Sequence, residues 1–150
     1  MNELIVLLFA AIPVLEVRAS VPLGIIAYHL NPATVIVLSI IGSVLPVFPL
    51  LWCLKNLTVK LREKPAFDKF FDWLFKRTRA KSALIKDLEL VGLALFIGVP
   101  LPGTGVWTGT IAAYLLDLPW IPTFIAATVG TALASAIMWA ASMGIIKFFL

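Results

Sequence analysis

Three long stretches of this chain contain no lysine, arginine, aspartate or glutamate: residues 19–54, 90–116 and 118–146. An α-helix rises about 1.5 Å per residue, so about 20 apolar residues cross the roughly 30 Å hydrocarbon core of a bilayer. The chain of 150 residues is 61% hydrophobic and 13% charged, whereas a soluble domain has about 45–50% apolar and about 25% charged residues. The pattern predicts an all-α integral membrane protein, and an unusually apolar soluble domain is the weaker alternative.

Charge is concentrated between the first and second of these stretches. Residues 55–89 contain ten lysines and arginines against five aspartates and glutamates. Basic loops between membrane segments stay on the cytoplasmic side, so we expect a cytoplasmic connector. A basic run can also bind nucleic acid, but between membrane segments this is the weaker interpretation, and we expect no nucleic-acid partner. The chain then forms a single membrane domain, with a first half at 1–54, the connector at 55–89 and a second half at 90–150.

Part of the connector has the pattern of an amphipathic helix, with Pro65 in its first turn. Apolar residues recur at i, i+3, i+4, i+7 and i+8, with charged residues between them. This helix could lie in the headgroup region of an anionic leaflet, in contact with membrane lipids, or pack on the protein's own membrane helices. The sequence leaves both open. The residues of this expected membrane-interface helix are Phe67, Phe70, Phe71, Trp73, Leu74 and Phe75.

The two halves of the chain resemble each other. The matched positions are Phe9 with Phe96, Pro13 with Pro100 and, after a slip of one residue, Ala27-Tyr28 with Ala113-Tyr114. Chance similarity between apolar segments is the alternative. The shared order of aromatic residue, proline and aromatic pair favours an internal repeat.

Each half begins with an apolar segment that is too short to span a bilayer before it is interrupted. Residues 4–15 would form about 18 Å of helix. Glu16 and Arg18 are poorly suited to the membrane centre, and Pro22 removes a helical hydrogen bond. We therefore expect the chain to enter the membrane, turn at residues 16–21 and return to the same side.

The second half is expected to enter over residues 90–99 and to turn at 100–105, PLPGTG. The alternative is a spanning helix kinked by proline in each half. With re-entrant hairpins, residues 33–54 cross once, kinked at Pro46 and Pro49, and residues 119–146 cross back. The expected fold is an inverted repeat of two re-entrant helical hairpins, each followed by a transmembrane helix, with the cytoplasmic amphipathic helix between them and both termini outside.

Two motifs resemble a known family. The pattern Glu16-x-Arg18-x-x-x-Pro22-x-Gly24, followed by PLPGTGVWTG from Pro100 to Gly109, resembles the small multidrug export family, which is itself similar to the DedA (SNARE-associated, VTT) superfamily. The resemblance implies paired re-entrant hairpins, residence in the cell membrane of a prokaryote, and proton-dependent transport or lipid translocation. DedA proteins often carry a second arginine in the later hairpin. This chain has Pro-Gly-Thr-Gly at 102–105 instead, which weighs against chemistry that needs two arginines.

Glu16 and Arg18 are the expected proton and substrate site. A charge at the membrane centre must be paired or hydrated, so we expect Glu16 and Arg18 to meet each other, the backbone of the opposite hairpin or a shared cavity. In extended backbone, side chains two residues apart point to the same side, whereas in a helix they lie about 200° apart, so pairing predicts unwound backbone here. Burial and the neighbouring guanidinium act on the Glu16 carboxyl in opposite directions, which would let it carry a proton. The alternative is a buried structural pair that carries nothing.

The remaining candidates lie at the two hairpin tips and are expected to line the pathway. The threonines there could bind substrate or simply satisfy backbone groups, and the tryptophan could stack on a flat cation or fill space. These residues are Pro22, Gly24, Pro100, Pro102, Gly103, Thr104, Gly105, Trp107, Thr108 and Gly109.

No motif of an enzyme is present in the sequence, which lacks a serine nucleophile elbow, a phosphate loop and metal-ligand spacing. We expect a protein without enzymatic activity, cofactor or metal. The first hypothesis is a transporter that exports a small amphiphilic solute in exchange for protons. The second is a lipid scramblase or flippase that moves headgroups past Arg18, and the third is a scaffold whose basic helix recruits partners. A homodimer could complete the pathway, and the sequence leaves the oligomeric state open.

Overall fold

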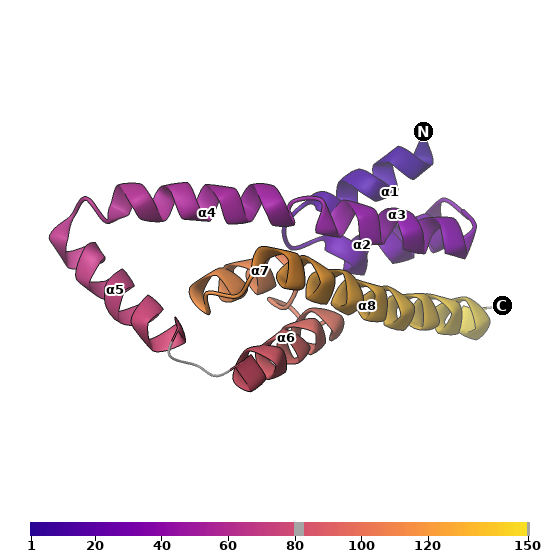
Figure 1. Cartoon of the computed structure of the whole chain (residues 1–150). Coiled ribbons are helices and arrows are strands. Elements are labelled where there is room, and N and C mark those ends of the chain that lie inside the picture. The colour runs from indigo at the N-terminus through magenta and orange to yellow at the C-terminus, as the bar shows by residue number, and fades with distance from the viewer. Residues whose placement is uncertain (80–82, 150) are drawn as a thin grey trace.

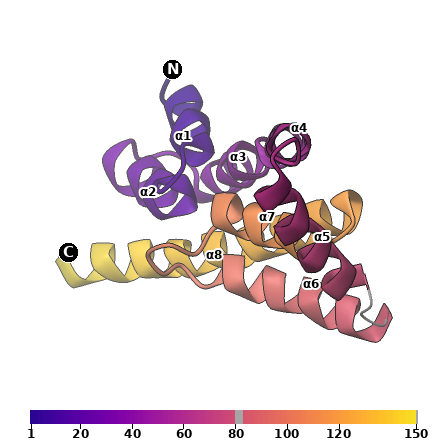
Figure 2. The same ribbon diagram turned by 90° about the vertical axis from the view of Figure 1, so that its left-hand side faces the viewer.

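Long helices form the frame of the molecule. The computed structural model describes residues 1–79 and 83–149, and this part of the chain is helical, without a β-strand. The helices α3 and α4 run nearly end to end, and the long α8 crosses them (Figures 1 and 2). The elements are α1 (Asn2–Ala11), α2 (Glu16–Pro22), the π-helix η1 (Leu23–Ala27), α3 (Pro32–Val44), α4 (Val47–Leu61), α5 (Pro65–Arg79), α6 (Ala83–Gly98), α7 (Val106–Leu115) and α8 (Trp120–Phe149).

Two segments are long and apolar enough to cross a bilayer: Pro32–Leu61, which comprises α3 and α4, and Trp120–Gly144 in α8. In the most apolar 18 residues of each segment, only 39% and 33%, respectively, is buried within the protein. A core helix of a soluble protein would be mostly buried, so these faces suit contact with lipid. The start of α1 and the end of α8 lie toward one end of the molecule and α5 toward the other (Figure 1).

Local sequence explains where several helices begin and break. The Asn31 side chain accepts a hydrogen bond of 2.9 Å from the Ala33 amide, and Pro32 occupies the first turn of α3. Pro46 separates α3 from α4, at the predicted kink. Pro65 begins α5, as its position in the amphipathic pattern predicts.

The first half differs from the sequence prediction at its turn. The chain reverses over residues 12–15, and Glu16 already begins α2, so the unwound backbone predicted at 16–21 is wrong. Val14 and Glu16 have positive φ values of 77° and 42°, so the reversal uses left-handed backbone before the charged residues. Pro22 does not end the helical path either. It leads directly into η1, in which the Tyr28 amide donates a hydrogen bond of 3.1 Å to the Leu23 carbonyl, five residues earlier.

The second half turns where the sequence predicts. The α6 helix ends at Gly98, residues 99–105 form a non-helical turn, and α7 begins at Val106. The structure extends α6 back to Ala83, into the segment assigned to the connector, because the apolar helical pattern continues through Leu84, Ile85 and Leu88.

Two clusters of buried apolar side chains hold the helices together. The first joins α1, α2, η1 and α3 to α8 and contains Val6, Val17, Val21, Ile25, Val35 and Ala134. The second joins α3 and α4 to α6, α7 and α8 and contains Val44, Val47, Leu51, Leu93, Ile97, Val106, Ala113, Leu118, Ala126 and Ala127. Helix α8 contributes to both, so it links the two halves.

Glycines set the closest helix contacts in each half. A Cβ added at Gly42 of α3 would overlap the Leu7 carbonyl of α1, and one added at Gly130 of α8 would overlap the Ala94 carbonyl of α6. Gly42 therefore lets α3 lie directly against the backbone of α1, and Gly130 lets α8 lie directly against the backbone of α6.

Alanine at Gly130 should destabilise the protein, whereas alanine at Gly144 of the same helix should not. An added Cβ at Gly144 meets nothing within 4 Å. We expect Gly130→Ala to cost about 1–3 kcal/mol through overpacking, and Gly144→Ala to be neutral or stabilising by up to about 1 kcal/mol. Thermal unfolding in detergent measures both, and equal effects of the two substitutions would contradict the packing described for α6 and α8.

Candidate functional site

The two turns lie against each other. The turn between α1 and α2 and the turn between α6 and α7 line a small cavity of about 110 Å³. The lining residues are Pro13, Val14, Glu16, Arg18, Gly103, Thr104, Gly105, Trp107 and Thr108. The structure thus brings together Glu16, Arg18 and five of the ten predicted tip residues, from positions about 90 apart in the sequence.

The Glu16 carboxylate caps the N-terminus of α7. The Val106 amide donates a hydrogen bond of 3.1 Å to Oε2, and the Trp107 amide donates one of 3.3 Å to Oε1. The first amides of a helix lack partners within the helix and carry the positive end of its dipole. Glu16 is 6% exposed and is the one charged residue among the buried residues that the structure describes. A buried anion therefore satisfies donors that the second half cannot satisfy itself.

Arg18 binds the second turn at a different point. Its Nη2 donates a hydrogen bond of 3.0 Å to the Thr104 hydroxyl. That hydroxyl lies 2.6 Å from the Val99 carbonyl oxygen, to which it can donate, and it accepts from the Leu101 amide. Since Glu16 and Arg18 both lie in α2, their side chains diverge, and they form no ion pair. The predicted same-side pairing is wrong, whereas the two other expected surroundings are present. Glu16 contacts backbone amides of the second half, and both side chains line one cavity.

Trp107 and Thr108 complete the contact. The Trp107 indole N–H donates a hydrogen bond of 3.3 Å to the Ala11 carbonyl, at the end of α1. Thr108 donates to the Gly103 carbonyl at 3.0 Å, which is the backbone-satisfying role. Ala11 and Val106 could not be selected from the sequence because they act through backbone groups. The only signal for Val106 was the glycine-rich run before it, after which a helix with uncapped amides begins.

Glycine has two different functions in the second turn. Gly103 has a φ of +86°, a conformation that favours glycine. Gly105 is extended, with a φ of 168°, which any residue can adopt, but an added Cβ there would overlap the Glu16 carboxylate. Position 105 is therefore restricted to glycine by the approach of Glu16.

The other predicted tip residues lie outside the cavity. Gly24 packs against Val35, and Gly109 packs against Ile97, so both serve helix contacts. The residues that do not line the cavity are Pro22, Gly24, Pro100, Pro102 and Gly109.

The predicted amphipathic helix is present as α5, and its apolar residues divide into two groups. Phe67, Phe70 and Trp73 are 44%, 52% and 55% exposed, whereas Phe71 is buried. The Phe70 ring contacts Phe71 edge-on. Phe75 belongs to α5, but its side chain lies outside the described residues.

Alanine at Gly105 should be harmful only while Glu16 is present. We expect Gly105→Ala to cost about 1–3 kcal/mol in the wild-type chain because the new methyl group displaces the carboxylate. In a Glu16→Ala background, where that carboxylate is gone, the same change should cost much less. Thermal unfolding of the four chains in a double-mutant cycle measures this coupling. Additive effects would contradict the direct contact between the two positions.

Comparison with known proteins gave one finding. The model of a family described as "Putative small multi-drug export protein" matches residues 16–137. The matched region begins at Glu16, directly after the first turn, and includes the second turn of the cavity and the whole connector. No similar curated protein and no similar solved structure was found.

Proposed function

Because the chain belongs to the small multi-drug export protein family, we propose that it is a membrane transporter that exports a small amphiphilic solute in exchange for protons. The description of the family as export proteins favours a transporter over an enzyme. The proton coupling and the solute class are our proposal. It rests on the Glu16 carboxylate, which lies between the two halves.

The Glu16 carboxylate supports proton coupling through its hydrogen bonds to the Val106 and Trp107 amides. Bonds from amides to an ionised carboxylate are stronger than those to a neutral acid. Proton uptake by Glu16 would therefore weaken the cap on α7 and loosen the contact between the two turns. Proton release would restore the cap. One titrating group thus sets whether the turns are closed together or free to separate.

The path of the solute would run between the two turns. Their contact otherwise consists of the Arg18–Thr104 bond and the Trp107–Ala11 bond, both only partly buried. The aromatic face of Trp107 and the apolar walls of the cavity would accept the hydrophobic part of an amphiphile. The planar guanidinium of Arg18 offers several N–H donors, so it would orient the polar part of the solute.

We propose that α1–η1 and α6–α7 are re-entrant hairpins related as inverted repeats. Helices α1 and α7, with ten residues each, are about 15 Å long and too short to span a bilayer. The matching glycine contacts at Gly42 and Gly130 support the repeat. So do His29 and Asp117, which precede α3 and α8 with nearly equal φ values of 52° and 53°. The connector would face the cytoplasm, with Phe67, Phe70 and Trp73 of α5 in the headgroup layer.

Lipid translocation is a second candidate function, favoured by Arg18 at the cavity. A guanidinium is well suited to a phosphate headgroup. The cavity has one arginine among its lining residues, so a headgroup would be held by Arg18 alone.

Replacing Glu16 with glutamine should abolish proton exchange while keeping the fold. We would reconstitute the chain in sealed proteoliposomes with an internal pH dye and impose an ethidium gradient. Glutamine keeps the size of the side chain and one acceptor oxygen, so it can accept one of the two amide bonds, but it cannot titrate. Ethidium-driven proton movement should therefore fall at least about tenfold, in line with the loss of a general acid–base group.

The matched control is Glu3→Gln, the same chemical change at an exposed position in α1, which should leave the flux unchanged. Equal reconstitution and a cooperative unfolding transition in each variant would confirm that both variants fold. Undiminished flux in Glu16→Gln would overturn the proposed proton carrier. Lipid scrambling by the wild type that is lost in Arg18→Ala, without ethidium-driven flux, would favour the second function instead.

A further inference from the structure

Helix α5 stands apart from the helices that form the body of the protein. It connects the end of α4 to the segment before α6 (Figure 1). Among the described residues, none from α5 belongs to either cluster of buried apolar side chains that holds the other helices together. The sequence left open whether the apolar face of α5 contacts lipid or the protein's own membrane helices, and this position favours lipid.

The exposed apolar side chains of α5 are aromatic. Phe67, Phe70 and Trp73 recur at intervals of three residues, so they lie on one face of the helix, and all three are exposed. Beside them, an apolar depression of about 350 Å³ is lined by Leu61 at the end of α4 together with Phe67, Phe70 and Phe71. Aromatic rings and an apolar depression at the end of a membrane span are suited to the region of lipid headgroups and upper acyl chains.

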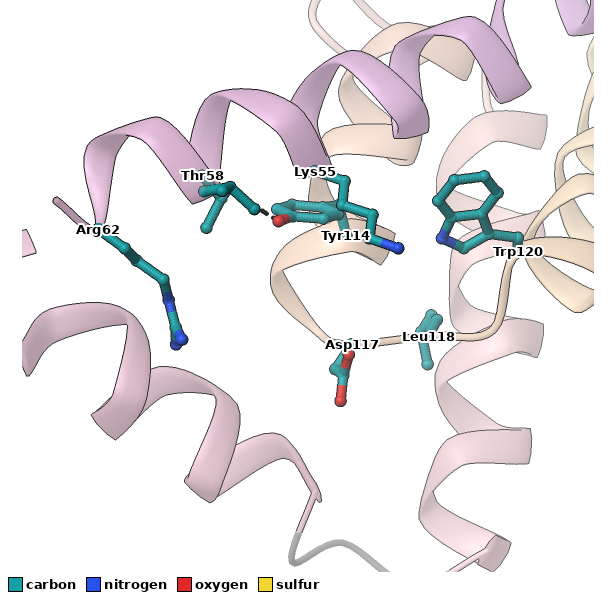
Figure 3. A pocket seen from close by; sticks show the side chains of 8 residues that line it. Lys55, Thr58, Arg62, Tyr114, Asp117, Leu118 and Trp120 are labelled. Atoms are coloured by element: carbon teal, nitrogen blue, oxygen red, sulfur yellow. Dashed lines mark hydrogen bonds between the residues drawn. The ribbon is translucent and has the colours of Figure 1, made fainter. Parts of the chain in front are cut away.

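The two acidic residues of α5 lie beside a cation of α4. Arg62 extends from the end of α4 toward α5 (Figure 3). Its Nη2 donates a hydrogen bond of 2.9 Å to the Asp72 carboxylate, and its Nε lies 3.9 Å from the Asp68 carboxylate. One turn earlier on α4, the Thr58 hydroxyl accepts a hydrogen bond of 2.8 Å from the Tyr114 hydroxyl of α7 (Figure 3). The acidic side of α5 is therefore attached to the body of the protein.

The lysines of α5 border its aromatic face. Lys69 and Lys76 are exposed and lie one turn before and one turn after Trp73. By sequence, α5 carries four basic and two acidic residues, and Arg62 lies beside both acidic ones. The net charge of this surface is positive. Anionic headgroups are its electrostatic complement, because they attract basic segments at the membrane surface.

We propose that α5 binds the surface of an anionic bilayer, with Phe67, Phe70 and Trp73 inserted among the headgroups and with Lys69 and Lys76 on lipid phosphates. The start of an acyl chain fills the depression beside the aromatic rings. In a bilayer without anionic lipid, α5 loses the electrostatic part of this binding and is detached for more of the time. The inference rests on the membrane position proposed for α5 and not on proton exchange.

The test is hydrogen exchange of the full-length chain in lipid nanodiscs, measured by mass spectrometry. We would compare discs of phosphatidylcholine alone with discs that also contain phosphatidylglycerol. The α5 amides should exchange at least about fivefold more slowly with the anionic lipid, because binding suppresses local opening of the helix. Amides of α8 should exchange equally in both discs.

Single lysine variants test which side chains bind the lipid. In discs with phosphatidylglycerol, Lys69→Gln and Lys76→Gln should each speed α5 exchange about fivefold, the usual contribution of one lysine near an anionic surface. Lys60→Gln is the matched control, since Lys60 lies on α4 and lines a different depression with Trp52 and Asn56. It should change the rate less than twofold. Salt needs no variant: about 1 M sodium chloride, with a Debye length of about 3 Å, should remove most of the anionic-lipid effect in the wild type.

Equal α5 exchange in the two discs, or an effect of Lys60→Gln as large as that of Lys69→Gln, would overturn the proposal. Stronger protection by an added oligonucleotide in neutral discs than by phosphatidylglycerol would assign the basic surface to nucleic acid instead. A chain that enters neither disc would overturn the membrane position and this inference with it. Absence of ethidium-driven proton flux, with α5 still protected by anionic lipid, would overturn the transporter alone.

Discussion

The arrangement of this protein depends on the need to satisfy backbone amides in an apolar interior. The turn before α7 leaves the amides of Val106 and Trp107 without partners in their own helix, and the Glu16 carboxylate accepts both. Neither group is stable there alone, since an isolated buried anion and uncapped amides both carry a large desolvation cost. Each half therefore completes the other at the point where the two turns meet, and α8, which contributes to both apolar clusters, holds them in place.

This mutual dependence gives the site its chemical character. An ion pair between Glu16 and Arg18 would satisfy both charges within α2 and would depend little on the second half of the chain. Because the two side chains diverge, Glu16 contacts the start of α7 and Arg18 contacts Thr104. A change in the charge of Glu16 consequently acts on the contact between the halves, which is the property that a proton-driven transporter needs. Membership of the small multi-drug export protein family agrees with that use.

The end of the molecule that carries α5 follows a different principle. Arg62 joins α4 to α5 through Asp68 and Asp72, while Lys55 lies near the Trp120 ring. These groups are partly exposed, so their mutual attraction is weak in water. Their value lies in their position at the ends of two apolar segments, where charged and aromatic side chains together meet headgroups.

Much of this organisation could be predicted from the sequence. Uncharged stretches longer than a bilayer, the basic connector and the break at Pro46 follow from local composition and from the chemistry of proline, which act wherever the chain lies. The residues Glu16, Arg18, Thr104 and Gly105 could be selected because charges and glycines are unusual in such surroundings. Only the tertiary structure decided what they contact. Local reasoning placed the turn on the charged residues, whereas the chain reverses before them and Glu16 starts a helix, because its anion is stabilised by amides about 90 residues away, and no local pattern records that partner.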